Sequence, residues 1–140
     1  MVFIGSMSTM PQTTRSICWC KMVHIVEFSV TRVDNHFMYQ VVLCNCPDSN
    51  VAQTIATQLV QEKLAACVNI MPNITSVYSW QEKIETDTEV MLLIKTTQSH
   101  FDKLAVLINS MHPYDVPEIV ALNIQQGNNA YLNWITESLK

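Results

Sequence analysis

The chain is built around two stretches, CVNIMPNITSVYSW (residues 67–80) and TEVMLLIKTT (residues 88–97). Both stretches have the composition of β-strands, and they predict a two-stranded ribbon joined through residues 81–87. At about 3.3 Å per residue an unbroken first strand would span roughly 45 Å, whereas a usual strand spans about 17–20 Å. A two-stranded arm that projects from a domain is only marginally stable in water, so we expect a second copy of the chain to cover it.

The apolar pattern within the ribbon gives a second indication of self-association. Every residue from Val90 to Ile94 is apolar, which predicts that both faces of this strand are covered. Helices can cover only one face of a small sheet, so the other face needs a second sheet. In the first strand Pro72 lacks an amide donor and the apolar phase changes between Ile74 and Val77, which predicts a bulge or bend.

The remaining segments alternate between strand and helix around the ribbon. The pattern predicts a strand over residues 39–45, helices over 49–64 and 99–111, a strand over 119–124 and a terminal helix over about 131–139. Pro113 and Pro117 hold residues 112–118 (HPYDVPE) in an extended loop, because each proline ring fixes its own φ. This order predicts an α+β fold, namely a ferredoxin-like βαββαβ antiparallel sheet with an extra C-terminal helix.

Composition separates residues 1–37 from residues 38–140. The first segment has no sustained period of 2 or 3.6, so we expect a poorly ordered extension, in which only residues 22–30 are apolar enough for a short strand. Arg15, Lys21 and Arg32, with no acidic residue before Glu27, fit an organelle transit peptide, although a variable or wrongly assigned start explains them equally well. Residues 38–140 form the predicted domain.

Overall composition excludes several classes of protein. The five cysteines are an odd number, so at least one stays unpaired, which favours a reducing compartment and predicts a cytoplasmic protein. The net charge is −4 and no basic run is present, which argues against nucleic-acid binding. No apolar run approaches the roughly 20 residues that cross a bilayer, so we expect no direct membrane insertion.

Cys44 and Cys46 are the first candidates for metal chemistry. In a β-strand, side chains two residues apart point to one face, so the two sulfurs could share a soft metal such as Cu(I). The alternative is a pair of small buried apolar side chains, as free cysteines often are. Cys18 and Cys20 repeat the spacing, but their segment has no predicted structure and the spacing is not that of a zinc ribbon.

His112 and Glu118 are the second candidates, because an imidazole and a carboxylate suit Cu(II) or Zn(II). The structural alternative is that the His112 ring caps the carbonyls of the preceding helix and that Glu118 opens a strand. Glu89 and Lys95 lie at the two ends of an apolar strand, which allows either an ion pair between subunits or ordinary exposure.

Four aromatic residues with polar tips, Tyr78, Trp80, Tyr114 and Trp134, suit trimer packing or the walls of a cleft between subunits. The sequence contains no nucleophile elbow, no glycine-rich phosphate loop and no HExxH motif, so we expect no enzyme. An acid/base pair of His112 with Glu118 or Asp115 is the minority alternative.

Five blocks of the chain resemble the CutA family, the divalent-cation tolerance proteins, over about residues 39–140. The blocks are LAACVNI (64–70), SVYSW (76–80), Glu89 with LLIKTT (92–97), HPYDVPEI (112–119) and YLNWI (131–135). The resemblance implies a ferredoxin-like subunit in a tight homotrimer, in which long strands of one subunit extend the sheet of the next. It also implies copper binding by Cys44 and a metal site at His112 and Glu118, and it implies nothing for Cys46.

The resemblance leaves two main hypotheses for function. The first is a trimeric metal-responsive protein that binds copper or another divalent metal, with Cys44 as a soft ligand and His112 and Glu118 as further ligands, not necessarily in one site. The second is a rigid trimeric scaffold that holds a small ligand or protein partner between subunits, as PII signalling proteins do. Animal members of the family are linked to acetylcholinesterase assembly, which is a partner role.

Overall fold

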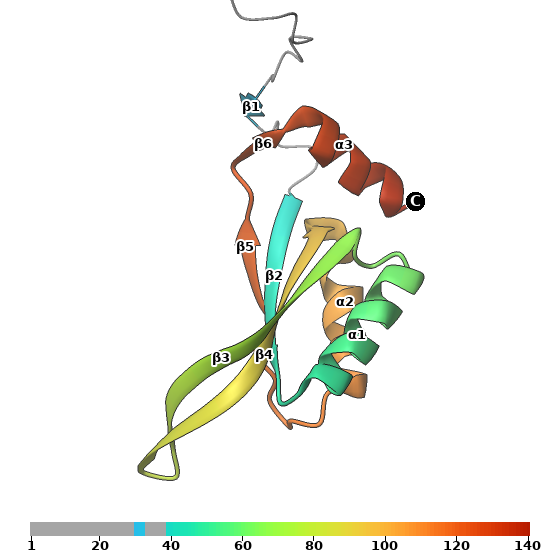
Figure 1. The fold of residues 1–140 in the computed structure, drawn as a ribbon. Helices are drawn as coiled ribbons and strands as arrows, with labels where there is room; N and C mark the ends of the chain where they lie inside the picture. The colour runs from blue at the N-terminus through green and yellow to red at the C-terminus, as the bar shows by residue number, and fades with distance from the viewer. Residues whose placement is uncertain (1–29, 33–38) are drawn as a thin grey trace, which may run out of the picture.

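A computed structural model describes residues 30–32 and 39–140, and Figure 1 shows its ribbon. The strands are β1 (Val30–Arg32), β2 (Tyr39–Cys46), β3 (Cys67–Trp80), β4 (Lys83–Thr97), β5 (Val120–Asn123) and β6 (Gln126–Asn128). The helices are α1 (Ser49–Gln61), the 3₁₀ turn η1 (Gln98–His100), α2 (Phe101–Met111) and α3 (Asn129–Ser138). Among these helices none is long and apolar enough to cross a membrane.

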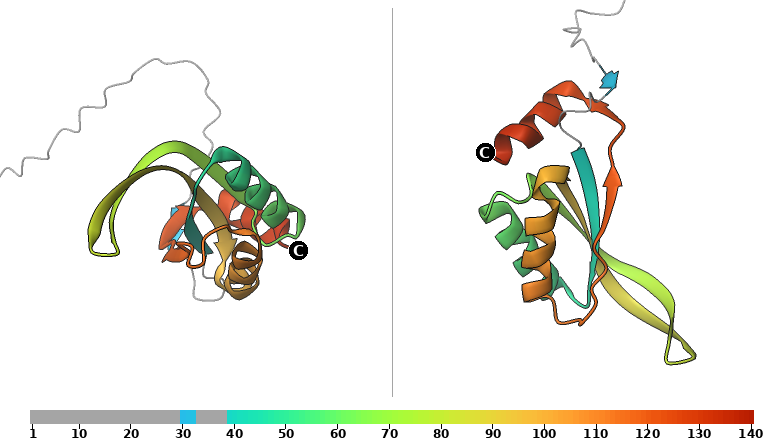
Figure 2. Two further views of the ribbon diagram at one scale, coloured as in Figure 1. Left: turned by 90° about the horizontal axis from the view of Figure 1, so that it is seen from below. Right: turned by 180° about the vertical axis from the view of Figure 1, so that it is seen from behind.

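The main sheet has the strand order β3-β4-β2-β5, and all of its pairs are antiparallel. Helices α1 and α2 pack on the same face of it (Figures 1 and 2). The elements therefore follow the predicted βαββαβ order, and α3 is the predicted extra helix. A small second sheet pairs β1 with β6, and β1 begins at Val30, the last residue of the apolar segment 22–30. The rest of that segment lies outside the described residues.

The core lies between the sheet and these two helices. Helix α1 begins because the Asp48 carboxylate accepts hydrogen bonds from the amides of Asn50 and Val51, at 2.8 and 2.9 Å. Its apolar stripe then meets alternate residues of the strands. The side chains in this core that are fully inaccessible to solvent are Val42, Cys44, Cys46, Ala52, Leu59, Leu92, Ile94, Leu104 and Ile108. Both cysteines of β2 thus belong to the core.

The β3–β4 ribbon is longer than the sequence predicted. The connection is a two-residue turn at Gln81–Glu82 rather than residues 81–87, so β4 begins at Lys83. Both turn residues have positive φ, 47° and 65°, as in the turns that suit the twist of a hairpin. The register shifts between Met71 and Ile74, where Asn73 has a φ of 61°, so the bend predicted around Pro72 is confirmed.

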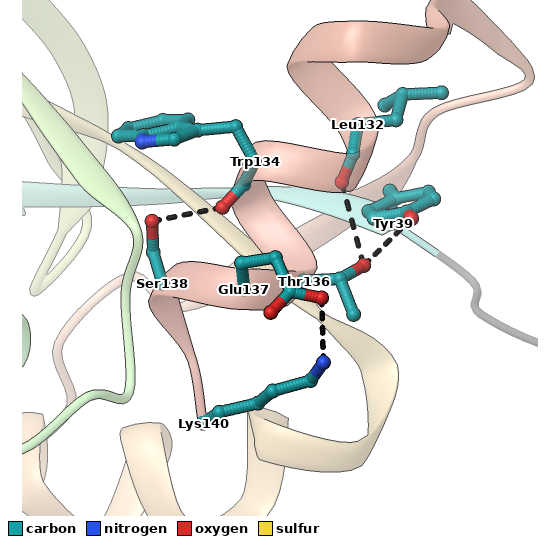
Figure 3. A network of polar contacts seen from close by, with 7 residues as sticks. All are labelled: Tyr39, Leu132, Trp134, Thr136, Glu137, Ser138 and Lys140. Atoms are coloured by element: carbon teal, nitrogen blue, oxygen red, sulfur yellow. Dashed lines mark hydrogen bonds and ion pairs between the residues drawn. The ribbon is translucent and has the colours of Figure 1, made fainter.

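The face of the sheet opposite the helices is covered at one end only. Helix α3 packs Leu132, Ile135 and Leu139 against Tyr39 and Ala66. The Tyr39 hydroxyl also shares a 2.8 Å hydrogen bond with that of Thr136, as Figure 3 shows.

Beyond α3 the same face is apolar and open to solvent. Met71, Val120 and Leu122 are 46%, 46% and 51% exposed. The face that was expected to need a second sheet is therefore uncovered in the single subunit.

Candidate functional site

Three buried side chains with metal-ligating atoms meet where strand β2 ends. The sulfur atoms of Cys44 and Cys46 and a ring nitrogen of His112 all lie within 4.8 Å of one another. The cysteines share a face because they are two residues apart on one strand, as the sequence predicted. His112 can reach them for two reasons. It directly follows α2, and strand β5 pairs only with residues 40–43 of β2. The loop after α2 therefore passes along the free edge of the last residues of β2.

The hydrogen bonds of His112 fix its tautomer. Nε2 lies 2.8 Å from the carbonyl oxygen of Asn45, which can only accept, so Nε2 carries the proton. Nδ1 accepts the amide of Tyr114 at 3.1 Å. The imidazole is therefore neutral, and a metal ion could bind it only by displacing one of these two partners.

The alternative that the His112 ring caps α2 is wrong. The helix is closed by the backbone amide of His112, which donates to the carbonyl of Ile108 at 2.9 Å. The ring points away from the helix end to strand β2. The ring thus joins the helix layer to the edge of the sheet, which is a structural role in its own right.

The two thiols titrate as a pair. Interaction with the Cys46 side chain is the strongest cause that raises the pKa of Cys44. Burial and the negative charges of Cys46, Glu118 and Glu89 raise the pKa of Cys44 further. The same interaction lowers the pKa of Cys46.

A groove of about 760 Å³ adjoins this cluster, between the outer part of β3 and the loop after α2. It is lined by Asn45, Ser76, Val77, Tyr78, Trp80, Glu89, Pro113, Tyr114, Asp115, Val116 and Glu118. The lining holds three carboxylates and three aromatic rings and includes no lysine or arginine. The groove is thus amphipathic and negatively charged.

The carboxylate of Glu89 is the most deeply placed acid of the groove, with 7% of the residue exposed. It accepts hydrogen bonds from the hydroxyl of Tyr114 at 3.1 Å and from the side-chain amide of Asn45 at 3.4 Å. Burial, followed by this bond to Glu89, raises the pKa of Tyr114. Asn45 and Tyr114 each also bond His112, so the groove and the cysteine cluster share one hydrogen-bond network.

The predicted site residues separate into distinct places. Glu118 lines the groove and acts on Cys44 through its charge, but it does not belong to the compact group of three ligand atoms. Tyr78, Trp80 and Tyr114 line the groove. Trp134 lies on α3, where it stacks on Tyr131 with ring centroids 5.4 Å apart. The four aromatic residues therefore do not form one wall within the subunit.

Glu89 and Lys95 do not pair within the subunit. The Lys95 ammonium, on a residue that is 8% exposed, donates to the side-chain oxygen of Asn69 and, at 2.9 Å, to the carbonyl of Leu93. Glu89 takes its hydrogen bonds from Tyr114 and Asn45. Two buried charges thus rely on neutral partners, and an ion pair between subunits stays a prediction.

Comparison with known proteins identifies the family. The sequence model of the family described as CutA1 divalent ion tolerance protein matches residues 40–138. The chain is 52% identical over 101 residues to the divalent-cation tolerance protein CutA of Thermus thermophilus, covering 72% of this chain and 98% of that protein. It is 48% identical over 92 residues to human protein CutA, covering 66% of this chain and 51% of that protein.

Solved structures agree with the fold. The divalent cation tolerance protein from Thermus thermophilus superimposes with a TM-score of 0.68 at 54% identity, covering 69% of this chain and 94% of that one. The periplasmic divalent cation tolerance protein CutA from Archaeoglobus fulgidus superimposes with a TM-score of 0.72 at 37% identity, covering 74% of this chain and 100% of that one. The chain belongs to the CutA1 divalent ion tolerance family.

Proposed function

We propose that this chain is a homotrimeric divalent-cation tolerance protein that binds copper or a related metal ion and takes part in the response to such ions. The observation that carries the proposal is the buried group of Cys44, Cys46 and His112, with ligand atoms within 4.8 Å of one another. The names of the relatives, which refer to tolerance of divalent cations, support it.

The donor set fits this class of metal. Sulfur and imidazole donors suit copper and zinc, whereas magnesium and calcium prefer oxygen donors. Cys44 and His112 would hold the ion. Glu118, on the groove wall, would be a further ligand if the loop after α2 moved toward the cysteines.

The trimer is supported by two features of the isolated subunit. The first is the open apolar face of the sheet, and the second is the part of the ribbon that projects beyond the helices (Figure 1). A neighbouring subunit that pairs a strand with the ribbon would cover both. Sedimentation equilibrium tests this part of the proposal, and a stable monomer at micromolar concentration would contradict it.

The metal-binding part is tested by measuring copper and zinc stoichiometry on the purified wild type and on Cys44→Ser and His112→Ala. Cys67→Ser is the matched control, because Cys67 is a free cysteine of the same sheet outside the three-residue group. We expect the first two variants to lose bound metal and the control to keep it. Equally weak binding in all four proteins would refute the proposal.

A second candidate function rests on the groove. Its aromatic walls and carboxylates suit a small ligand or a protein segment at the subunit boundary, which would make the protein a rigid trimeric scaffold or signalling module, with an acetylcholinesterase assembly role as one example. Retention of a defined partner after the metal has been stripped, and its loss in Trp80→Ala, would favour this function over metal binding.

We further propose a non-enzymatic, cytoplasmic protein whose domain spans residues 38–140, with residues 1–37 as an extension that could direct it to an organelle. The free cysteines Cys44, Cys46 and Cys67 support a reducing compartment. Relatives named as chloroplastic and periplasmic show that location varies within the family. Fractionation of cells that express the full chain, compared with a chain lacking residues 1–37, tests the location.

A further inference from the structure

We propose that the groove between the outer part of β3 and the loop after α2 binds a linear organic polycation, in which ammonium groups alternate with short methylene segments. This inference rests on the second candidate function, a small ligand in the groove, and deepens it by naming the chemical class of that ligand. It does not depend on Cys44, Cys46 or His112, because these three residues do not line the groove.

The groove has the size of a site for an organic ligand. Its volume of about 760 Å³ lies within the range of about 300–1,000 Å³ that is usual for small-molecule pockets, and a single metal ion would leave most of it empty. One wall is strand β3, and the other is a loop in which the rings of Pro113 and Pro117 fix the backbone φ. The groove is therefore largely formed before a ligand arrives.

The charges of the groove select a cation. Its lining includes the carboxylates of Glu89, Asp115 and Glu118 and no lysine or arginine. The carboxylate of Asp87, which accepts a hydrogen bond from the Tyr78 hydroxyl on the β3 wall, adds a fourth negative charge beside it. A phosphate-bearing ligand would meet repulsion from all four carboxylates, whereas a cation is attracted by each of them.

The carboxylates are distributed along the groove rather than gathered at one point. In the part of the chain that the structure describes, the compact metal-ligating group is that of the two cysteines with His112, and Glu89, Asp115 and Glu118 do not form another. A compact divalent ion needs several oxygen atoms at about 2.0–2.6 Å from one centre, so this lining suits it poorly. A ligand with separated positive charges can meet the carboxylates one at a time.

The aromatic residues of the groove suit the methylene segments of such a ligand. Tyr78 and Trp80 lie two residues apart on one face of β3, and Tyr114 lies on the opposite loop. Among the described residues, the one ring that contacts any of these three is that of His112, 4.9 Å from Tyr114 between centroids. The three rings therefore do not close into a cage around a single head group. Spread along the walls, they offer apolar contact to methylenes and ring faces to ammonium groups.

A second copy of the chain matches the charge of the groove less well than a polycation does. Each chain has a net charge of −4, and residues 82–87, at the end of the ribbon that would reach a neighbour, hold three acidic residues and one lysine. A neighbouring subunit that closes the outer side of the groove would thus bring more acid than base. A cation from solution is the better counter-charge.

The test is isothermal titration calorimetry of the full chain, freed of bound metal, with four probes: spermidine, putrescine, Mg²⁺ and ATP. We expect one spermidine per chain, affinity that falls in the order spermidine, putrescine, Mg²⁺, and no binding of ATP. Putrescine and Mg²⁺ carry the same charge, so the difference between them reports the shape of the site rather than its charge. Tighter binding of Mg²⁺ than of putrescine would overturn the linear polycation.

Substitutions locate the bound ligand. Glu89→Gln should weaken spermidine binding by about tenfold or more, because it removes a buried charge that pairs with an ammonium group. Glu118→Gln and Trp80→Ala should each weaken it by about two- to fivefold. Glu62→Gln, an exposed carboxylate at the end of α1, is the matched control and should leave binding unchanged. Glu118 and Trp80 are exposed, so they keep the test valid if Glu89→Gln does not fold. Wild-type affinity in both Glu118→Gln and Trp80→Ala would overturn the groove as the site.

The remaining outcomes separate this inference from the functions proposed above. Binding of ATP that is lost in Trp80→Ala would overturn the cationic class and keep the groove as a site for a small ligand. Absence of binding of all four probes would overturn the polycation while metal binding, measured on Cys44→Ser and His112→Ala, is decided separately. Spermidine should bind Cys44→Ser as tightly as it binds the wild type, because Cys44 does not line the groove.

Discussion

Strands β3 and β4 are joined by backbone hydrogen bonds in both halves of the ribbon, yet the two halves lie in opposite environments. In the proximal half, residues 67–71 and 90–97, Leu92 and Ile94 are fully buried. In the distal half, residues 74–80 and 83–89, Val77, Trp80 and Ile84 are 66%, 63% and 74% exposed. Backbone pairing is therefore not what distinguishes them. The proximal half is stabilised by packing within the subunit, and the distal half lacks such packing.

The largest expected effect comes from truncating the proximal half. Leu92→Ala leaves a cavity between the sheet and the helices and should lower the free energy of unfolding by about 2–5 kcal/mol. Ile84→Ala, at the exposed tip, should cost less than about 1 kcal/mol because little buried area is lost. Chemical denaturation measures both. Equal losses at the two positions would show that the tip is as well packed as the base.

The distal half should instead affect assembly. Val77→Asp places a charge on a side chain that is exposed in the subunit and covered in the proposed trimer. We expect an unchanged circular dichroism spectrum and self-association weakened by about tenfold or more, which corresponds to about 1.4 kcal/mol. Sedimentation velocity measures the change.

Val106→Asp is the matched control for this substitution. Val106 is 70% exposed on α2, on the opposite side of the sheet from the open face. Equal weakening by both substitutions would mean that added charge, rather than the position on the ribbon, disturbs assembly. No weakening by Val77→Asp would remove the distal half from the interface.

The proximal half was predictable from the sequence because continuous apolar runs report burial directly. The run Val90 to Ile94 predicted a strand covered on both faces: the helices cover the face of Leu92 and Ile94, and the cover of the other face stays a prediction. Pro72 predicted the bend. The start of β4 was missed because Gln81 and Glu82 adopt positive φ without the glycine or asparagine that usually signals such a turn. Local sequence propensity therefore fails to predict a turn whose residues tolerate backbone strain.

The candidate site was predictable only in part, for a related reason. The shared face of Cys44 and Cys46 follows from strand geometry, and the sequence indicated it. The arrival of His112 beside them depends on the register that places Val120, the first residue of β5, opposite Leu43, and no local pattern reports this register. The separation of Glu118 from the thiols likewise depends on the path of the loop.

The smallest expected effect concerns a polar contact in the distal half. The Tyr78 hydroxyl donates a hydrogen bond to the Asp87 carboxylate on the facing strand, and this bond is the main reason why the pKa of Tyr78 is raised from 10.0 to about 12. A raised phenol pKa means that the folded ribbon favours the protonated form. Its small contribution to stability is therefore complete below pH 10 and disappears as the pH rises toward 12.

Replacing the acceptor tests whether this contact ties the two distal strands together. Asp87→Asn should lower the pKa of Tyr78 toward 10.0, whereas Asp102→Asn on α2 should leave it unchanged. An NMR titration of the tyrosine rings in the alkaline range measures the shift. A Tyr78 pKa that is the same in both variants would mean that the distal strands are held by their backbone ladder alone, and the case for an external cover over that half would be stronger still.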